Sequence, residues 1–353
     1  MMFNKTKIQL AGLFAAFLTT VIFCLVTGCK TTIEEKNLKR FEFGAPKMGT
    51  WWRIVLYATD KELAEKAANE AFKKIAELDD KFTDYYAESQ LMQLCYKSGN
   101  GEVKVDDELY DIISKAIQIS EKTDGAFDIT AGPSIQLWRW SGRHNQLASK
   151  EKMDAALKLV GYKKIKLNPK NRSITLTDAG MRLDLGGIAK GYGADTALKI
   201  LKKYGISRAL VAASGDIAVG EPPPGKKGWK IEIGSGENKT NTLGITLVLK
   251  NKGVSTSGDV EQFIEINGIK YSHILNPKTG LGLTNRIQVT VIAECATKSD
   301  PLATACCVLG LEKGIQLIES DKNTAALFIA GDGTNKVIKP STRFKQFIDS
   351  SLR

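Results

Sequence analysis

The sequence predicts an α+β fold: one unit of two packed lobes, with mixed or antiparallel sheets flanked by helices. Two long amphipathic helical stripes occupy the first half, at 61–82 and 106–122. Strand-like runs dominate from residue 229 onward. The 353-residue chain is long enough for two domains, but it has no internal repeat and no clean linker, which favours a single unit.

The first half begins with a polar and charged tether at 30–45 and a strand at 51–59, where apolar and polar residues alternate. The helical stripes follow, with Leu63, Ala67, Ala71, Ile75, Leu78 and Phe82 on one and Leu109, Ile112, Ile113, Ala116 and Ile117 on the other. Both stripes are interpreted as core.

The middle of the chain alternates between loops, strands and helices. A Gly- and Pro-containing loop is predicted at 124–147. The elements after it are a helix at 151–160, strands near 163–167 and 172–177, the end of a strand at 182–185, a helix at 188–204 and a buried strand at 208–213.

The second half is predicted to be rich in strands. Pro222–Gly225 marks a surface loop, and Asn267-Gly268 is a strong type I′ hairpin signal. The predicted strands are 229–234, 243–250, 260–267, 269–275, 286–293 and 325–330, with helices at 297–309 and 311–319 and a turn at Asp332-Gly333.

The N-terminus carries an export signal. Lys5 and Lys7 precede an apolar run at 8–26 that ends in small residues before Cys29. This resembles the lipobox of bacterial lipoproteins, which implies a signal peptide at 1–28, lipidation of Cys29 and a tether at 29–40. The alternative is a plain transmembrane anchor. Either interpretation places the protein outside the cytoplasm, held to a bacterial membrane on its periplasmic or outer face.

The net charge and the cysteine content limit the classes of partner that the protein can bind. The net charge of +11 and the pI near 9.2 suit an anionic ligand or a membrane surface. The lysines are scattered and no basic patch is interleaved with aromatic residues, which argues against nucleic acid. Four cysteines lie beyond Cys29, without a CxxC pair that would indicate zinc, and a disulfide among them stays open: Cys95, Cys295, Cys306 and Cys307.

A candidate anion site lies at 182–195. Gly186 and Gly187 make a turn, and Lys190 falls in the first turn of the following helix. Free backbone N–H groups, the helix dipole and a lysine together favour phosphate at this point. The alternative is a strand–turn–helix whose lysine points into water. The segment is not a Walker loop, because the lysine does not follow a glycine run.

Two further stretches suit a binding site. Residues 123–133 form a glycine-broken loop with an acid between apolar residues, which fits a pocket wall or a plain turn. Residues 254–259 form a hydroxyl-rich turn between strands. There Thr256 and Ser257 would donate to phosphate or ribose, unless the segment is an ordinary Ser/Thr turn.

Two stretches suggest catalytic chemistry. His273 sits at a strand end before a turn, where a histidine can act as acid, base or ligand, although a lone histidine is more often structural. Asp300-Pro301 reads as a helix start with Asp300 as N-cap. Asp300 and Thr304 are four residues apart, so their oxygens share one helical turn and would hold Mg²⁺ bridging to phosphate.

Six motifs in order resemble the ApbE family of flavin transferases, FAD:protein FMN transferases of which many are lipoproteins. The resemblance covers roughly 41–340, which implies one ApbE-like, T-fold-related catalytic domain with two lobes at 41–345. The motifs are Met48-Gly-Thr50, Asp-Gly-Ala-Phe-Asp at 124–128, Leu-Gly-Gly-Ile-Ala-Lys-Gly-Tyr at 185–192, Thr-Ser-Gly-Asp at 256–259, Tyr-Ser-His-Ile at 271–274 and Ser-Asp-Pro-Leu-Ala-Thr at 299–304.

The resemblance implies a Mg²⁺-dependent enzyme. It would cleave the FAD pyrophosphate, release AMP and attach FMN to a threonine or serine of a membrane or exported redox protein. Mg²⁺ would be held by the Gly187 carbonyl, Asp300 and Thr304, and His273 is the candidate base, with Lys190 adding positive charge. Positions matching FAD contacts are Met48, Tyr85, Ala126, Phe127, Asp128, Asp184, Lys190 and Ile274.

Three departures from the family pattern concern specificity. Asn276 stands where the family usually has Asp, Ser214-Gly215 replaces a Gly-Gly pair, and Cys95 replaces a common Asn. Three rival functions also stay open: an FAD pyrophosphatase, a non-catalytic flavin-binding lipoprotein and a solute-binding lipoprotein. The solute-binding interpretation needs two similar lobes, which the strand-rich second half does not suggest.

Overall fold

The computed structural model describes residues 37–234, 242–258, 263–331 and 335–349, and its main element is an eight-stranded sheet. Every neighbouring pair in this sheet is antiparallel. This confirms the predicted class. In spatial order the strands are β1 (Lys39–Lys47), β2 (Thr50–Ala58), β6 (Ala209–Ala213), β7 (Asp216–Val219), β10 (Lys252–Gly258), β15 (Ile287–Ala293), β16 (Ala325–Ala330) and β17 (Val337–Pro340).

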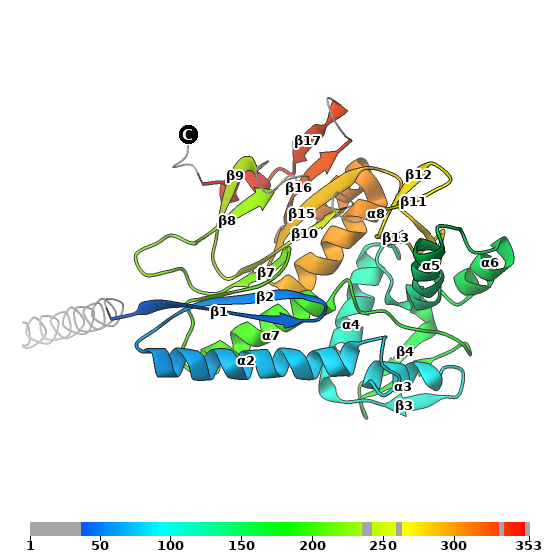
Figure 1. Ribbon diagram of the computed structural model, residues 1–353, viewed down its shortest axis with the longest axis horizontal. Coiled ribbons are helices and arrows are strands. Elements are labelled where there is room, and N and C mark those ends of the chain that lie inside the picture. Colours follow the sequence, from blue (N-terminus) through cyan, green and yellow to red (C-terminus); the bar gives the residue numbers. More distant parts are fainter. Residues whose placement is uncertain (1–36, 235–241, 259–262, 332–334, 350–353) are drawn as a thin grey trace, which may run out of the picture.

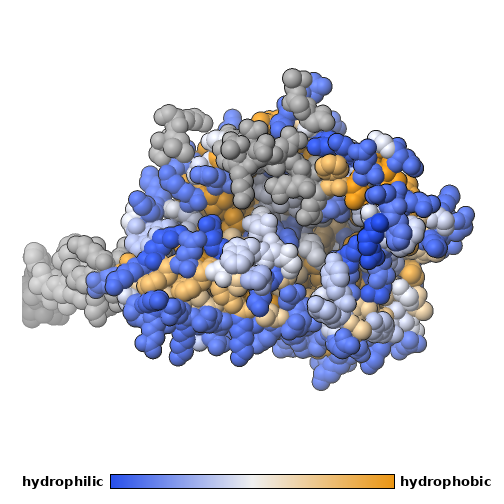
Figure 2. Space-filling model, viewed as in Figure 1, coloured by the Kyte–Doolittle hydropathy of each residue, from blue (hydrophilic) through white to orange (hydrophobic). Residues whose placement is uncertain are grey.

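Side chains alternate across the sheet because successive strand residues point to opposite faces. Ile54 and Leu56 of β2 pack with α2 (Lys61–Phe82) and α7 (Ala189–Lys203), whereas Val55 packs with Trp229 on the other face. That second face is covered by the hairpin of β8 (Trp229–Gly234) and β9 (Thr242–Leu249). Figure 1 shows α2 and α7 together beneath the β1–β2 hairpin. In Figure 2 hydrophilic side chains line the outer side of α2.

The second lobe is built from helices around a small antiparallel sheet, at the right of Figure 1. One buried cluster runs from Ile112 and Ile174 in this lobe to Val289 in β15 of the large sheet, so the two lobes share a core. The lobe contains α3 (Gln90–Tyr96), β3 (Glu102–Lys104), α4 (Asp107–Lys122), α5 (Gly132–His144), α6 (Lys150–Lys158), β4 (Ile165–Asn168) and β5 (Ser173–Leu176).

Several short elements complete the described chain. Asn267 and Gly268 both have positive φ and join β11 to β12, which confirms the predicted hairpin. The short elements are η1 (Ile129–Ala131), η2 (Tyr162–Lys164), β11 (Phe263–Ile266), β12 (Ile269–Ser272), β13 (Leu275–Asn276), β14 (Leu281–Gly282) and η4 (Phe344–Phe347).

Helix α8 (Ala296–Ser320) crosses the molecule between the sheet and the second lobe. It is broken at Gly310, whose φ of 76° is not helical, so the predicted division between 309 and 311 is confirmed. By length and composition α8 passes as a possible membrane span among the described residues. Its packing against β10, β15 and α7 identifies it instead as a core helix.

The start of α8 is capped by a side chain from another helix. Both carboxylate oxygens of Asp195, on α7, accept backbone N–H groups of α8, from Ala296 at 3.0 Å and from Thr297 at 2.8 Å. The Thr297 hydroxyl also donates to Asp195. Asp195 therefore satisfies orphan donors of α8 and fixes its start beside α7.

Replacing Asp195 by alanine is expected to lower the free energy of unfolding by about 2 kcal/mol, the upper end for loss of a helix cap. Urea unfolding followed by circular dichroism measures the change. Lys199→Ala, at an exposed position one turn further along α7, is the matched control and should change stability by less than about 0.5 kcal/mol. An Asp195→Ala midpoint equal to that of this control would contradict the capping role.

Some predicted elements were wrong. Residues 39–45, interpreted as tether, belong to β1, where half-buried Phe41 and Phe43 alternate with charged residues. The predicted loop at 124–147 contains α5, because Gly132 and Pro133 begin a helix there. Residues 182–185 are not in a strand, and 254–258, interpreted as a turn, lie in β10, a central strand.

Several short elements carry no clear sequence signal, and some predicted features lie outside the described residues. The elements α3, β3, β7, β14 and β17 were also missed. The signal peptide, Cys29 and the turn at 332–333 lie outside the described residues. Within the described chain, Cys95, Cys295, Cys306 and Cys307 form no disulfide.

Candidate functional site

The site centres on the point where the starts of α7 and α8 meet. A side chain on Gly191 would place its Cβ 2.3 Å from the Ala296 carbonyl oxygen and 2.9 Å from the Asp300 Cβ. Only glycine allows this approach. The Gly191 N–H donates to a carboxylate oxygen of Asp300 at 3.0 Å, so the first turn of α7 faces the first turns of α8.

Lys190 forms an ion pair inside the molecule. Its ammonium group donates to Asp216, whose side chain is 3% exposed, while the Lys190 side chain is 31% exposed. Burial alone would lower the pKa of Lys190, but the carboxylates of Asp300 and Asp216 outweigh burial and raise this pKa. The interpretation that Lys190 points into water is therefore wrong.

Asp300 is a buried carboxylate one turn inside α8, not the N-cap that the sequence suggested, because α8 begins at Ala296. Burial, and then the neighbouring Asp216, raise the pKa of Asp300 to about 7, against the pull of Lys190. When Asp300 is ionised, two carboxylates and one lysine leave an excess of negative charge, which a bound cation would balance.

The predicted metal ligands converge, and all are hard oxygen donors. A Cβ on Gly187 would lie 3.7 Å from the Thr304 hydroxyl oxygen, which places the 186–187 turn against α8. The Ser257 and Thr304 hydroxyl oxygens are 3.4 Å apart. In the described part of the chain, no group of three or more His, Cys, Asp and Glu side chains is arranged to hold a metal ion. One carboxylate, a hydroxyl and a carbonyl nevertheless suit Mg²⁺ that is completed by phosphate and water.

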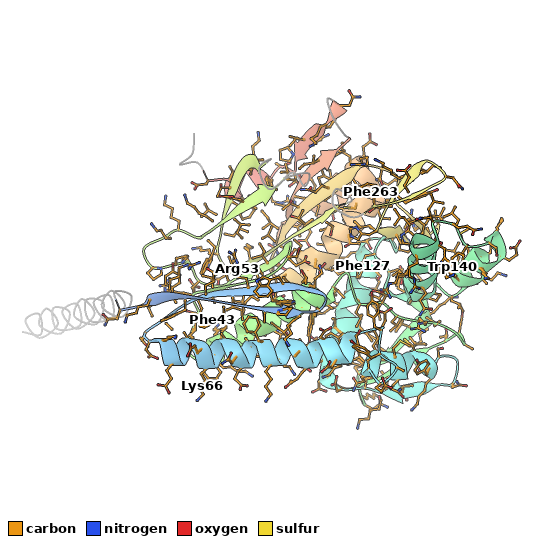
Figure 3. All side chains as sticks on the ribbon, in the orientation of Figure 1. Phe43, Arg53, Lys66, Phe127, Trp140 and Phe263 are labelled. Carbon is orange, nitrogen blue, oxygen red and sulfur yellow. The ribbon has the colours of Figure 1, made fainter. Side chains whose placement is uncertain are left out.

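The loop before α5 supplies an apolar wall beside this point. Phe127 is buried, and its ring lies 3.1 Å from the position of a Cβ on Gly187. Figure 3 shows Phe127 near the middle of the molecule. Ala126 and Ile274 are buried in the same cluster. Phe127 therefore lies beside the 186–187 turn, and Ala126 and Ile274 belong to the core cluster that surrounds it.

Asp128 stabilises the conformation of this loop through hydrogen bonds. One oxygen of its carboxylate accepts the Thr130 N–H at 2.8 Å and the Thr130 hydroxyl at 2.6 Å. The other oxygen accepts the Tyr162 N–H at 2.8 Å. Burial raises the pKa of Asp128 against these hydrogen bonds. The side chain therefore links two loops of the second lobe.

Asp184 and Tyr85 form a second group of predicted FAD positions. One Asp184 oxygen accepts the Gly186 N–H at 2.8 Å, and the other accepts from Arg139 at 2.8 Å. Burial, and then Asp84, raise the pKa of Asp184, whereas Arg139 lowers it. The guanidinium of Arg139 also lies over the exposed Tyr85 ring, 4.7 Å from its centroid.

Met48 lies in the β1–β2 turn with a φ of 46°, and its N–H donates to Asp79 at 2.7 Å. Its methyl group reaches α7, 3.6 Å from the position of a Cβ on Gly193. Thr256 is on β10, where its hydroxyl lies 2.9 Å from that of Thr290. His273 is exposed between β12 and β13, directly before buried Ile274.

Two site residues were missed by sequence reasoning. Asp216 begins β7 two residues after Ser214, whose positive φ turns the chain from β6 into β7. The departure from the family pattern at Ser214-Gly215 was the available sequence signal for this turn. Arg139 had no signal, because its segment was interpreted as a loop. Both residues act through contacts with partners distant in sequence.

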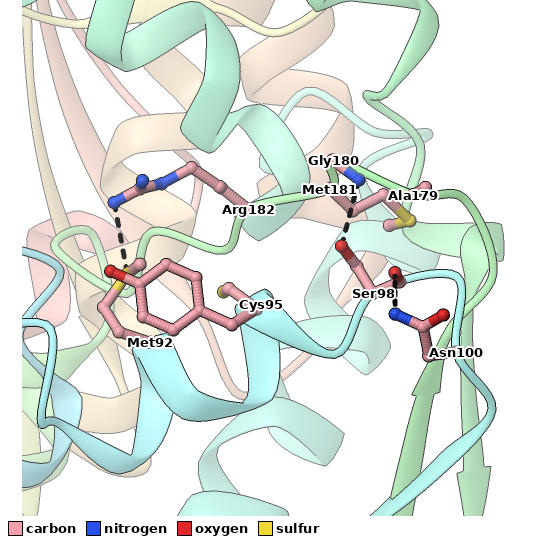
Figure 4. Close-up of a pocket in the computed structure, with 9 residues that line it drawn as sticks. Met92, Cys95, Ser98, Asn100, Ala179, Gly180, Met181 and Arg182 are labelled. Atoms are coloured by element: carbon pink, nitrogen blue, oxygen red, sulfur yellow. Dashed lines mark hydrogen bonds between the residues drawn. The ribbon is translucent and has the colours of Figure 1, made fainter.

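A separate pocket of about 390 Å³ lies between α3 and the 179–182 segment (Figure 4). On one side the Arg182 guanidinium reaches the Met92 sulfur at 3.2 Å. Cys95 accepts the Leu183 N–H at 3.3 Å, and burial raises the pKa of this thiol to about 11, which disfavours a reactive thiolate. The lining residues are Met92, Cys95, Tyr96, Ser98, Asn100, Ala179, Gly180, Met181 and Arg182.

Comparison with known proteins gives consistent matches. The model of the ApbE family matches residues 48–328. A FAD:protein FMN transferase of Escherichia coli K12 is 28% identical over 312 residues, covering 86% of this chain and 88% of that protein. The crystal structure of the ApbE protein from Thermotoga maritima is 31% identical with a TM-score of 0.79, covering 88% of this chain and 100% of that one. The apo flavinyl transferase ApbE of Pseudomonas stutzeri is 28% identical with a TM-score of 0.79, covering 88% and 97%.

Proposed function

Because the chain belongs to the ApbE family, we propose that it is a FAD:protein FMN transferase, an enzyme that moves FMN from FAD to a hydroxyl of another protein. The finer proposal is Mg²⁺-dependent transfer to a threonine or serine with release of AMP. The single observation that supports it most is the meeting of Lys190 with two carboxylates, its ion-pair partner Asp216 on β7 and Asp300 near the start of α8.

The residues present fit a pyrophosphate site. Asp300, the Thr304 hydroxyl and the Gly187 carbonyl would hold Mg²⁺, which when bound would neutralise phosphate charge. Lys190 would add a second positive charge beside the first turn of α7. Pyrophosphate is an unreactive anion, so positioning and charge neutralisation should dominate its cleavage.

The proposed reaction balances without a redox partner. The acceptor hydroxyl oxygen forms a bond to the phosphorus on the FMN side of FAD. The bond from that phosphorus to the bridging oxygen breaks, and AMP leaves with the electron pair. The hydroxyl proton passes to a base, for which His273 is the candidate because it is exposed beside buried Ile274.

A peptide-transfer assay tests the proposal. An acceptor peptide containing threonine is incubated with enzyme, FAD and Mg²⁺, and its mass is measured. The proposal expects addition of FMN to the peptide and one AMP for each peptide modified. Free FMN and AMP with an unmodified peptide would show a pyrophosphatase instead. FAD binding without AMP release would show a non-catalytic flavin-binding protein.

Replacing His273 by asparagine is expected to slow transfer by about 10²–10⁴-fold, the usual contribution of a general base. The Kd for FAD should change less than threefold. Transfer rates and FAD titrations measure the two effects. His144→Asn, at an exposed position on α5, is the control and should leave both unchanged. Weaker FAD binding with an unchanged maximal rate would reassign His273 to flavin contact.

The N-terminal signal supports an extracytoplasmic, lipid-anchored enzyme whose acceptor is a membrane or exported redox protein. Lipidation of Cys29 would hold the catalytic domain near such acceptors. Detergent phase partitioning tests this proposal: the full chain should enter the detergent phase, and Cys29→Ser should return it to the aqueous phase. Equal partitioning of both proteins would refute the anchor.

A further inference from the structure

Arg139 links three segments that are far apart in the sequence. It projects from α5 and forms charge-assisted contacts with Asp84 at 2.5 Å and Asp184 at 2.8 Å. Its guanidinium also stacks on Tyr85. Arginine is suited to this arrangement because its planar fork binds carboxylates while its face packs on an aromatic ring.

The contacts are sheltered from water. The side chains of Asp84, Asp184 and Arg139 are 11%, 10% and 33% exposed. Asp84 and Asp184 bind the same guanidinium, and neighbouring carboxylates repel each other when no cation lies between them. Arg139 therefore favours the ionised form of Asp184 and holds its carboxylate in place, and Asp184 in turn accepts the N–H of Gly186 in the 186–187 turn.

Tyr85 presents a stacking surface. One face of its ring is covered by the guanidinium, and the residue is 74% exposed. Because the guanidinium restricts the orientation of the ring, the open face of the tyrosine can stack on another planar group with little further loss of entropy. The side chain of Gln136, one turn earlier on α5, can accept from Arg182, so the helix contributes a second polar contact to the same region.

We propose that Arg139 is a positioning residue for the flavin nucleotide: it fixes the Asp184 carboxylate and the Tyr85 ring in the orientation that binds FAD. The proposal rests on the proposed function, because Asp184 and Tyr85 are assigned to FAD through the family. Arg139 acts through these two side chains and does not itself contact the reacting phosphorus.

FAD titration of matched variants tests the proposal, with flavin fluorescence as the readout, since a stacked tyrosine quenches flavin emission. Arg139→Met keeps the aliphatic stem and removes the fork. It should raise the Kd for FAD about tenfold and reduce the quenching of bound FAD, while the transfer rate at saturating FAD falls less than threefold. Arg139→Lys, which keeps the charge, should recover part of the affinity. Arg143→Met, at an exposed position on the same helix, is the control and should bind as the wild type does.

A double-variant cycle separates positioning from simple loss of stability. Once Tyr85 is replaced by leucine, Arg139→Met should weaken FAD binding by less than it does in the wild type, because one of the positioned groups is gone. Equal effects in both backgrounds, or wild-type affinity and quenching in Arg139→Met, would overturn the proposal. If Arg139→Met does not fold, Arg139→Lys decides: wild-type affinity and quenching there would overturn it.

The same titration distinguishes failure of the proposed function from failure of the role proposed for Arg139. Wild-type protein that fails to bind FAD refutes the proposed function and the role of Arg139 together. Wild-type protein that binds FAD and transfers FMN, with Arg139 variants that behave identically, refutes the role of Arg139 alone.

Discussion

Asp300→Ala is expected to abolish FMN transfer, with a loss of at least a hundredfold. Loss of one fixed electrostatic group in an active site typically costs about 10²–10³-fold in rate, and Asp300 is proposed to hold the cation as well. The carboxylate is buried, faces Lys190 and Asp216, and accepts the Gly191 N–H. Steady-state transfer to an acceptor peptide at saturating FAD measures the rate.

The fold should survive this substitution. Burial and Asp216 raise the pKa of Asp300 to about 7, which means that the ionised carboxylate is unfavourable in the folded chain without a cation. Its removal should therefore leave the metal-free melting temperature near that of the wild type. The stabilisation of the wild type by added Mg²⁺ should disappear, because the variant no longer binds the ion more tightly when folded.

Glu312→Ala is the control for the Asp300 variant, because it removes an exposed carboxylate from the second part of the same helix. It should retain both transfer and the Mg²⁺-dependent rise in melting temperature. Near-normal transfer by Asp300→Ala would refute the metal assignment and leave the phosphate chemistry to Lys190 alone.

The sequence could predict those parts of the site that depend on local spacing. The turn at Gly186-Gly187 followed by a helix placed Lys190 in the first turn of α7, as the structure confirms. The four-residue spacing of Asp300 and Thr304 put both on one helical turn. Helices α2 and α4 were predictable because their apolar stripes are long and regular.

The sequence could not show the contacts between distant segments. Asp216 looks like an ordinary residue after a turn, and only the meeting of β7 with α7 makes it the partner of Lys190. Asp195 caps a helix that begins about a hundred residues further along the chain, so the local sequence pattern wrongly indicated Asp300 as the cap. β10 was missed because Ser and Gly favour turns locally, although its neighbours β7 and β15 make it a central strand.

Lys190→Met should also abolish transfer, and it separates the two roles that the lysine combines. Methionine keeps much of the aliphatic stem but leaves Asp216 buried without its partner. Removal of one partner of a fully buried pair costs about 3–5 kcal/mol, and the partial exposure of Lys190 should reduce this to about 1–3 kcal/mol. We expect transfer to fall at least a hundredfold, because the positive charge beside the pyrophosphate is lost. Transfer assays and urea unfolding measure the two effects.

Adding Asp216→Asn to Lys190→Met resolves whether lost activity follows from lost stability. The double variant has no unpaired carboxylate at position 216, so its unfolding midpoint should return toward that of the wild type. Its transfer rate should stay low, because neither substitution restores a cation beside the first turn of α7. Lys199→Met, exposed on the same helix, should match the wild type in both measurements. Recovery of transfer together with stability would mean that Lys190 serves only to neutralise Asp216, and the anion site would then depend on the backbone of α7 and the oxygens of α8.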